Sequence, residues 1–482
     1  MNLKNIFFVN YNLLLIIIIS FSILLRFYNL NHESFWIDEI ISFYVANPNI
    51  SFYETIQRHN LLEQVPILFN ISLKIYFKIF GYDYSHARYL VSFFSICSLA
   101  VCYLIIKKIT KNKSIRLFFI FLVGVNIYLI KYSFELRVYS LFVLLISFSL
   151  YYFICITNGQ QNKKNLFLFI LFSILSFLSH PFSLIVIFSC LLYYSFKSFK
   201  QKKFNQNINI SFLIIFLIAC IYYALYFYHL NEITSWIKII DFKFFTNLYF
   251  SKFFGSRIIG LFFLISLIIL IYRNFNFIIN SNLLIFLLII INSFTLPILF
   301  SFLIKPILID RYIIYVIVAI LVLISILTFK IKNNKLRSSI LFLFVFLTVG
   351  NFFTEDNFKQ FYKLTPKYKP EFNEAILLIE NSNISNLFVK KFMPPSKDKI
   401  KFYSILDDGV NEYLQHIINI NVHKVLLHNI NNMSSIGFNK FWILCYVDLD
   451  YDKCNLPSHI QNYNILDEMH LSKINLKLVL IK

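Results

Sequence analysis

Charged residues are scarce in this chain, and acidic residues are the scarcer kind. Asp, Glu, Lys and Arg make up 14% of the 482 residues, with 24 acids against 45 basic residues. Hydrophobic residues make up 58%, and the mean hydropathy is +0.68. A soluble protein of this length cannot hide so much apolar surface. Long, non-alternating apolar runs recur instead, so the sequence predicts a polytopic α-helical membrane protein.

Several other signals are absent. No Cys-x-x-Cys occurs, which excludes the usual redox and zinc motifs; Cys445 and Cys454 lie in a polar region and would pair only in an oxidising compartment. No small-x-small cleavage site follows the first apolar run, 11–28, so we interpret that run as a retained anchor. No internal repeat is visible.

The net charge of +21 does not by itself indicate a nucleic-acid partner. The chain is rich in Lys, Asn, Ile, Phe and Tyr together, as an AT-rich coding bias would produce, and we expect no nucleic acid to bind. The positions of the charges are more informative than their sum.

The apolar runs predict eleven membrane spans. They lie at 11–28, 87–106, 115–130, 138–156, 165–180, 181–196, 208–228, 258–272, 282–303, 311–329 and 339–353. Pro181 in "FLSHPFS" requires a tight turn between two of them.

The loops between these spans differ sharply in charge. One set, with the N-terminus, contains no Asp or Glu: the loops near 107–116, 157–164, 197–207, 273–281 and 330–338. Its basic residues are Lys4, Lys107, Lys108, Lys111, Lys113, Arg116, Lys163, Lys164, Lys197, Lys200, Lys202, Lys203, Arg273, Lys330, Lys332, Lys335 and Arg337. Basic loops face the cytoplasm. We therefore expect a multi-pass protein of the cell inner membrane, with the acids and the C-terminus on the extracytoplasmic side.

Three regions fall outside the spans. The first loop, 29–86, contains an amphipathic piece (65–81, with Lys74 and Lys78) that we expect to lie in the membrane interface. A second loop, 229–257, is rich in aromatic residues and Lys. The tail, 354–482, mixes one helix-like stretch with the strand-like runs "NLFVKK", "KVLLH", "FWILCYV" and "LKLVLI". We expect a transmembrane domain, 1–353, and a small extracytoplasmic α/β or α+β domain, 354–482.

Four polar clusters collect at the predicted extracytoplasmic boundary. They are Asp38-Glu39; Glu63-Gln64; Glu135, Arg137 and Tyr139; and Lys305, Asp310, Arg311 and Tyr312, with Arg88 and His180 at the same level. Each has a structural alternative. The acidic pair could complement a helix dipole, Glu135 and Arg137 could be interfacial charges, Arg311-Tyr312 could anchor a span, and His180 could serve a turn. Convergence on one face favours a site.

Such a site suits a substrate with a phosphate head and a lipid tail. Arginine is a planar, permanently charged phosphate ligand, so we expect Arg88, Arg137 and Arg311 to bind the phosphate. A carboxylate can act as general base toward an acceptor. The cations would stabilise the leaving phosphate as its bond to a sugar breaks, through an oxocarbenium-like state.

The motifs "SFWIDEIISFYVA", "EQVPILFNISLKIYFKIFG", "HARYLVSFFS", "YSFELRVYSLFVLL" and "PILIDRYIIYVIVAILVLI" resemble the glycosyltransferase C (GT-C) superfamily. The nearest branch contains the protein O-mannosyltransferases and the aminoarabinose transferase of lipid A. The resemblance covers roughly 30–150 and 305–325 and is weak between them.

The resemblance implies a polyprenyl-phosphate sugar donor in the membrane lipid, an inverting transfer and a catalytic first loop. It makes Asp38 the base and Glu39 its support. It places Arg137, with Glu135 and Tyr139, and Arg311 with Tyr312 at the donor phosphate. One motif departs from the family: Gln64 and Val65 stand where relatives have His or Lys and a first Pro. In some relatives the acid equivalent to Glu63 helps to hold a divalent metal, and Gln is a poor substitute for a His ligand, so metal use is an open expectation.

The leading interpretation is therefore a glycosyltransferase acting on an extracytoplasmic lipid, glycan or protein. Two alternatives remain: a transporter or flippase of lipid-linked sugars, and a glycan polymerase or ligase. Transporters place ionisable residues in mid-membrane and show repeated halves. A polymerase or ligase would share the donor class without the early Asp-Glu loop.

Overall fold

The structure is a computed structural model. It describes residues 10–63, 65–230, 237, 241–247, 252–354, 371–384, 386–389, 401–404, 422–423, 439–446, 463–471 and 474–481. Internal contacts divide the chain into two compact units. The helical unit comprises 1–28, 64–69 and 88–359, and the second unit comprises 29–63, 70–87 and 360–482.

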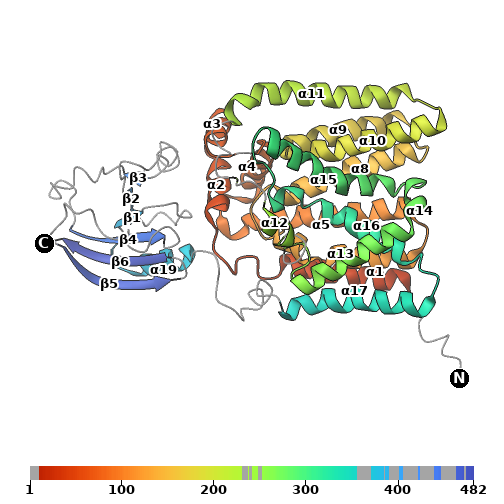
Figure 1. The fold of residues 1–482 in the computed structure, drawn as a ribbon. Helices are drawn as coiled ribbons and strands as arrows, with labels where there is room; N and C mark the ends of the chain where they lie inside the picture. Colours follow the sequence, from red (N-terminus) through yellow and green to blue (C-terminus); the bar gives the residue numbers. More distant parts are fainter. Residues whose placement is uncertain are drawn as a thin grey trace. The chain divides into compact units, whose positions relative to one another are not determined.

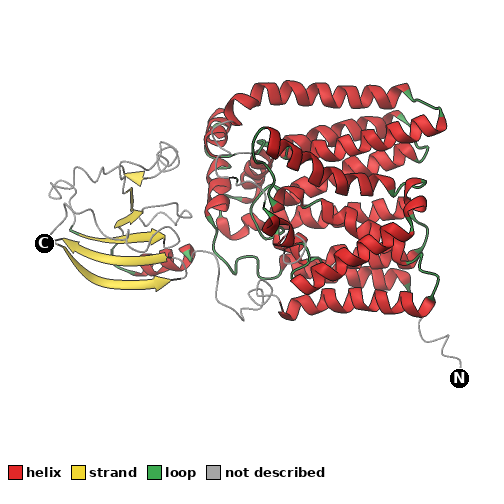
Figure 2. Cartoon of the chain, in the orientation of Figure 1, coloured by secondary structure: helices red, strands yellow, loops and turns green. Residues whose placement is uncertain are grey.

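The helical unit is a bundle of long apolar helices that run side by side (Figures 1 and 2). Its elements are α1 (Tyr11–Phe27), α5 (Tyr84–Ile109), α6 (Lys113–Gly124), α7 (Ile127–Lys131), α8 (Tyr139–Thr157), α9 (Lys163–Ser179), α10 (Ser183–Gln201), α11 (Gln206–Leu230), α12 (Phe242–Asn247), α13 (Arg257–Arg273), α14 (Phe275–Ile279), α15 (Leu284–Leu303), the 3-10 helix η3 (Asp310–Ile313), α16 (Val316–Thr328) and α17 (Asn334–Thr354). Every predicted span overlaps at least one of these helices. Within the described residues, six helices are long and apolar enough to cross a membrane, and α1 and α16 are shorter apolar helices.

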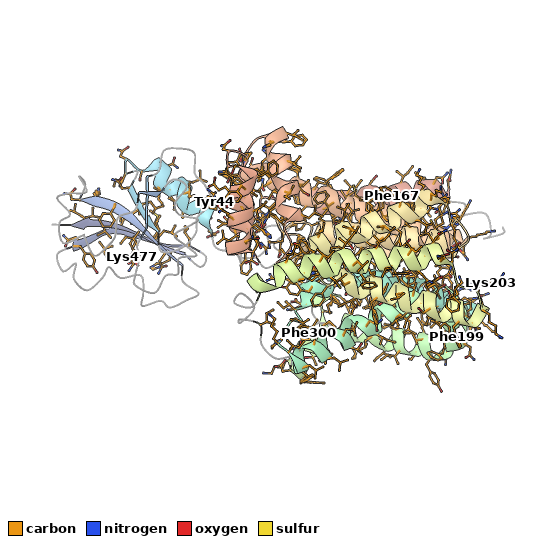
Figure 3. All side chains as sticks on the ribbon, turned by 90° about the horizontal axis from the view of Figure 1, so that it is seen from above. Tyr44, Phe167, Phe199, Lys203, Phe300 and Lys477 are labelled. Carbon is orange, nitrogen blue, oxygen red and sulfur yellow. The ribbon has the colours of Figure 1, made fainter. Side chains whose placement is uncertain are left out.

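Helix α16 forms the centre of the bundle. All of its residues are buried, and α6, α13, α15 and α17 contact it. A helix that is apolar all round is stable inside a protein or in lipid, and the burial of α16 shows that other helices surround it. By contrast, Phe167 of α9 and Phe199 of α10, labelled in Figure 3, are exposed, as expected where lipid replaces water.

The predicted span 115–130 is not continuous. Helix α6 ends at Gly124, and α7 starts afresh with Asn126 as its cap, whose side chain accepts a hydrogen bond from Leu129 N at 3.0 Å. The break leaves carbonyl groups at the end of α6 without partners in the helix. Arg26 of α1 donates hydrogen bonds to two of them, Gly124 O at 2.7 Å and Val123 O at 3.4 Å. The break could not be predicted from the sequence, because it lies inside an apolar run and residues distant in sequence stabilise it.

The first loop forms three helices: α2 (Ile37–Val45), α3 (Phe52–Leu62) and α4 (Leu68–Phe80). Helix α4 is the predicted amphipathic piece. Its Lys74 is fully buried, and Lys74 Nζ donates to Asn47 O and Ile50 O at 2.7 Å and to Thr55 Oγ1 at 2.9 Å. Lys74 thus stabilises the packing of the loop rather than facing outward as a surface lysine. Burial and the nearby Lys78 and Arg58 charges lower the pKa of Lys74.

The tail contains a mixed six-stranded sheet in the order β3-β2-β1-β4-β6-β5. Its elements are α19 (Phe372–Asn381), β1 (Asn386–Val389), β2 (Lys401–Ser404), β3 (Val422–His423), β4 (Lys440–Tyr446), β5 (Tyr463–Leu471) and β6 (Ile474–Ile481). The first four strands are parallel, and β6 pairs antiparallel with β4 and β5. Helix α19 packs against β6, and Trp442 Nε1 donates to Ser382 Oγ at 2.9 Å.

The predicted helix and three of the four predicted strands are confirmed as α19, β1, β4 and β6. The run "KVLLH" lies outside the described residues, as does Cys454 of the possible disulfide.

Candidate functional site

The acidic pair Asp38-Glu39 begins helix α2. Glu39 Oε2 accepts a hydrogen bond from Trp36 N at 3.2 Å, and the Glu39 side chain is fully buried. A carboxylate in this position caps the first turn and complements the positive end of the helix. The structural alternative therefore accounts for Glu39. Asp38, one residue earlier, is only half-buried, so it is the more accessible acid of the pair.

Glu63 ends helix α3 and lies next to the same turn of α2. Its backbone N–H donates to His59 O at 2.8 Å, and Glu63 Oε1 accepts from Ser42 Oγ at 3.1 Å. The Ser42 hydroxyl also lies 3.2 Å from the backbone carbonyl of Asp38. The Ser42 hydroxyl thus lies between the α2 backbone at Asp38 and the carboxylate of Glu63. The predicted neighbour Gln64 lies outside the described residues.

Sequence reasoning did not single out Ser42 or His59. His59 is almost fully buried, and its Nδ1 lies 3.0 Å from Asn70 Nδ2. The signal that could have identified His59 is the four-residue spacing of Thr55, His59 and Glu63, which places three polar residues on one face of α3. That face is buried rather than solvated.

In the helical unit, a tight segment between α7 and α8 positions the second group of predicted residues. Arg137 N donates to Glu135 O at 2.6 Å, and Ser140 Oγ donates to Tyr132 O at 2.9 Å. Arg137 is buried and Glu135 is half-buried. Burial, followed by the nearby Glu135 charge, raises the pKa of Tyr132 well above its ordinary value. The Tyr132 hydroxyl is therefore protonated at neutral pH.

The third group, at η3, meets this segment. The Arg311 guanidinium carbon lies 5.8 Å from the centroid of the Tyr139 ring, within cation–π range. The Tyr312 ring contacts His180 edge-on, with centroids 4.6 Å apart. Residues from η3, α8 and the α9–α10 turn, far apart in sequence, are thus brought together.

His180 lies at the centre of this cluster. It ends α9, and its Nδ1 accepts from Phe182 N at 3.3 Å, which leaves the proton of a neutral imidazole on Nε2. Among the described residues, His180 Nε2 is buried and has no hydrogen-bond partner. Arg137 and Arg311 both lie within electrostatic reach of the ring. The hydrogen bond from Phe182 N fits the expected role of His180 in the turn. This role does not explain why the Nε2 atom is buried.

Asp310 supplies the negative charge beside Arg311. Lys252 Nζ lies 2.7 Å from Asp310 Oδ2, and the Tyr128 hydroxyl donates to the same oxygen at 3.0 Å. Burial alone would raise the pKa of Asp310, but Lys252, then Tyr128 and Arg311, hold it below its ordinary value. The carboxylate is therefore ionised and fixed in place.

Sequence reasoning also did not identify Lys252 and Tyr128 as site residues, because only tertiary contacts bring them to Asp310. Their segments are tied together nearby, since Asn126 Nδ2 donates to Phe253 O at 3.0 Å. Arg88 is buried on α5 one turn before Ser92, whose hydroxyl donates to Ser133 O at 2.8 Å. We call the cluster of Tyr128, Tyr132, Tyr139, His180, Asp310, Arg311 and Tyr312 the aromatic end of the helical unit.

Comparison with known proteins gives a result for the fold alone. No family model and no curated protein sequence matches the chain. Among solved structures, ArnT from Cupriavidus metallidurans in the apo state matches 96% of this chain and 97% of its own, with a TM-score of 0.64 and 9% identity. The chain has a GT-C fold. ArnT from the same organism bound to undecaprenyl phosphate matches with a TM-score of 0.56 and 10% identity over the same shares.

The GT-C fold confirms the expected architecture of many membrane helices with an added C-terminal sheet. The residue roles that the resemblance implies stay predictions. Asp38, Glu39 and Glu63 belong to the second unit, and Arg88, Glu135, Arg137, Tyr139, His180, Arg311 and Tyr312 belong to the helical unit.

A divalent metal fits the described residues poorly. No group of three Asp, Glu, His or Cys side chains among them could hold a metal ion, and Glu63 already accepts a hydrogen bond from Ser42.

Proposed function

We propose that the protein is an inverting membrane glycosyltransferase. It transfers a sugar from a polyprenyl-phosphate donor to an acceptor outside the cytoplasm. The observation that carries the proposal is the GT-C fold over 96% of the chain, shared with an ArnT structure bound to undecaprenyl phosphate. The acid-free loops support an orientation in the inner membrane with those loops in the cytoplasm.

The aromatic end supplies the chemistry for the donor. In the proposal, Arg137 and Arg311 bind the phosphate, and Tyr139 and Tyr312 hold them in place. Both guanidinium groups lie near His180, and the neighbouring Asp310 is paired with Lys252. Two fixed guanidinium groups stabilise the negative charge that grows on the phosphate as its bond to the sugar breaks.

Asp38 is the proposed base. It takes the proton of the acceptor hydroxyl or amine while the acceptor atom forms a bond to the anomeric carbon. The bond from that carbon to the phosphate oxygen breaks on the opposite face, and polyprenyl phosphate leaves with the electron pair. Asp38 suits this role better than Glu39, because Glu39 is fully buried and accepts a hydrogen bond from the α2 backbone. Arg88 contributes to binding of the donor phosphate in this proposal, and Glu63 and Ser42 act as positioning residues.

The test compares Asp38→Asn with Glu33→Gln, a matched loss of one acid in the same loop. We expect Asp38→Asn to bind the lipid-phosphate sugar normally and to transfer sugar about 10²–10⁴-fold more slowly, the usual size of a general-base contribution. Glu33→Gln should keep wild-type transfer. Undiminished transfer by a folded Asp38→Asn protein would exclude Asp38 as the base.

The same preparation separates an enzyme from a transporter. In vesicles that contain a lipid-linked sugar and an acceptor, the enzyme produces a glycosylated acceptor and free polyprenyl phosphate. A flippase would move the lipid-linked sugar across the bilayer and leave the glycosidic bond intact. Movement without product would replace the proposed function by this alternative.

A further inference from the structure

The end of the helical unit formed by the acid-free loops has its own pocket. The loops that join α5 to α6, α8 to α9, α10 to α11, α14 to α15 and α16 to α17 gather at this end (Figure 1). Lys203, labelled in Figure 3, belongs to it. We call it the basic end. Since its loops contain no Asp or Glu, its cations cannot be neutralised by carboxylates of the same loops.

The pocket has a volume of about 580 Å³. It lies between the α5–α6 connection, the start of α15 and the end of α16. Its walls combine aliphatic, aromatic, amide and charged groups: Thr110, Asn112, Phe277, Asn282, Phe329 and Lys330. Pockets of roughly 300–1,000 Å³ with apolar walls and a few polar groups are typical of small-ligand sites.

Two cations are held at aromatic rings of this pocket. Lys330 Nζ lies 3.9 Å from the centroid of Phe277, and the Arg337 guanidinium carbon lies 6.0 Å from the centroid of Phe329. Lys330 is exposed, so its ammonium group remains accessible while the ring restricts its position. A ring contact leaves the hydrogen-bond donors of a cation available for an oxygen ligand.

Hydrogen bonds fix the walls. The Tyr193 hydroxyl donates to Asn282 Oδ1 at 2.6 Å, and Asn282 Nδ2 donates to Asn158 Oδ1 at 2.6 Å. On the other side, Arg116 Nε donates to Thr110 O at 2.9 Å. The pocket is therefore formed without a ligand, which lowers the entropy cost of binding one.

We propose that this pocket binds the phosphate head of an anionic phospholipid. The pocket lies where α5 ends and α15 begins, and both helices carry exposed apolar side chains (Phe93, Ile291 and Leu299). A lipid whose chains lie along these two helices brings its phosphate to this level. Basic pockets between membrane helices on the cytoplasmic side suit such head groups. The site is separate from the proposed donor site: Arg311 precedes α16, whereas Lys330 follows it, and the helix between them is about 20 Å long at 1.5 Å per residue.

The experiment measures lipid binding to the purified full-length protein in detergent by native mass spectrometry. The probes are phosphatidylglycerol, phosphatidylcholine and glycerol 3-phosphate. The pocket variant is Lys330→Gln with Arg337→Gln. The control is Lys163→Gln with Lys164→Gln, which removes the same charge from exposed residues of the same end outside the pocket lining.

We expect the wild type and the control to bind phosphatidylglycerol more tightly than phosphatidylcholine, and the pocket variant to bind phosphatidylglycerol at least tenfold more weakly. Equal loss in the control would mean unspecific attraction and would overturn the proposal. So would a wild type without preference for phosphatidylglycerol. Displacement of the lipid by an equal concentration of glycerol 3-phosphate would make the ligand a soluble phosphate ester and reject the lipid head group. Unliganded melting temperatures of both variants confirm folding.

Discussion

The two ends of the helical unit hold positive charge in opposite ways. At the aromatic end, Arg137 is buried, Arg311 lies at the Tyr139 ring, and the neighbouring Lys252 is paired with Asp310. At the basic end, the exposed Lys330 and the half-buried Arg337 contact aromatic rings, and the connections at this end contain no acid.

This contrast separates two kinds of anion recognition. Water and salt screen the buried guanidinium group of Arg137 only weakly. Such a group suits a phosphate whose charge changes during a reaction. An exposed cation such as Lys330 is screened more strongly, but the attractions of several such cations add together, which suits a membrane surface. The proposed functions of the two ends rest on this contrast between the buried Arg137 and the exposed Lys330.

The largest expected effect is on catalysis at the aromatic end. We predict that Arg311→Ala lowers kcat/KM for sugar transfer by about 10²–10³-fold, as expected when a donor to developing negative charge is lost. Arg337→Ala at the basic end should stay within about twofold of the wild type. Steady-state transfer assays on both variants, together with donor binding, measure the difference. Equal losses in the two would abolish the distinction between the ends.

Sequence reasoning predicted the helices well, because long apolar runs need no tertiary information to be recognised. It also predicted that five residues lie at one level of the membrane: Arg137, Tyr139, His180, Arg311 and Tyr312. In the structure, the other four lie around His180. The pattern that allowed this was the occurrence of polar residues at the ends of apolar runs.

Features that depend on distant contacts could not be predicted. The break after Gly124 lies in an apolar run and depends on Arg26, which is 98 residues earlier. Lys252 meets Asp310 only through the fold. Strand β5 was missed because its side chains are largely exposed and include Asp467 and Glu468, so it lacks an apolar face.

The second-largest effect is expected on stability, at the break between α6 and α7 that precedes Tyr128 of the aromatic end. We predict that Arg26→Met destabilises the protein by about 2–4 kcal/mol, because it leaves buried carbonyls of α6 without donors. Ser95→Ala, which removes the hydroxyl that accepts from Arg26 Nε at 2.9 Å, should cost only about 1 kcal/mol. Unfolding in mixed micelles with increasing denaturing detergent measures both. If Arg26→Met lowered the free energy of unfolding no more than Ser95→Ala does, Arg26 would not be the residue that stabilises the break between α6 and α7.

The smallest effect is expected on the pH dependence of stability, which tests the pairing of Asp310 with Lys252 at the aromatic end. In the wild type, the pKa of Asp310 is held below its ordinary value, so the carboxylate adds stability above about pH 4, where it also ionises in the unfolded chain. That stability is lost as the pH falls through the folded-state pKa. Lys252→Met removes the main favourable charge and leaves burial, which raises the pKa of Asp310.

The variant should therefore be about 1–2 kcal/mol less stable than the wild type at pH 7, a modest value because the Lys252 side chain is 46% exposed. The deficit should shrink as the pH is lowered toward 4, because protonation of Asp310 now relieves a buried charge. Lys243→Met, an exposed lysine on α12, serves as the control and should follow the wild type at every pH. A deficit for Lys252→Met that is constant from pH 7 to pH 4 would show that Lys252 stabilises the aromatic end by packing rather than by charge.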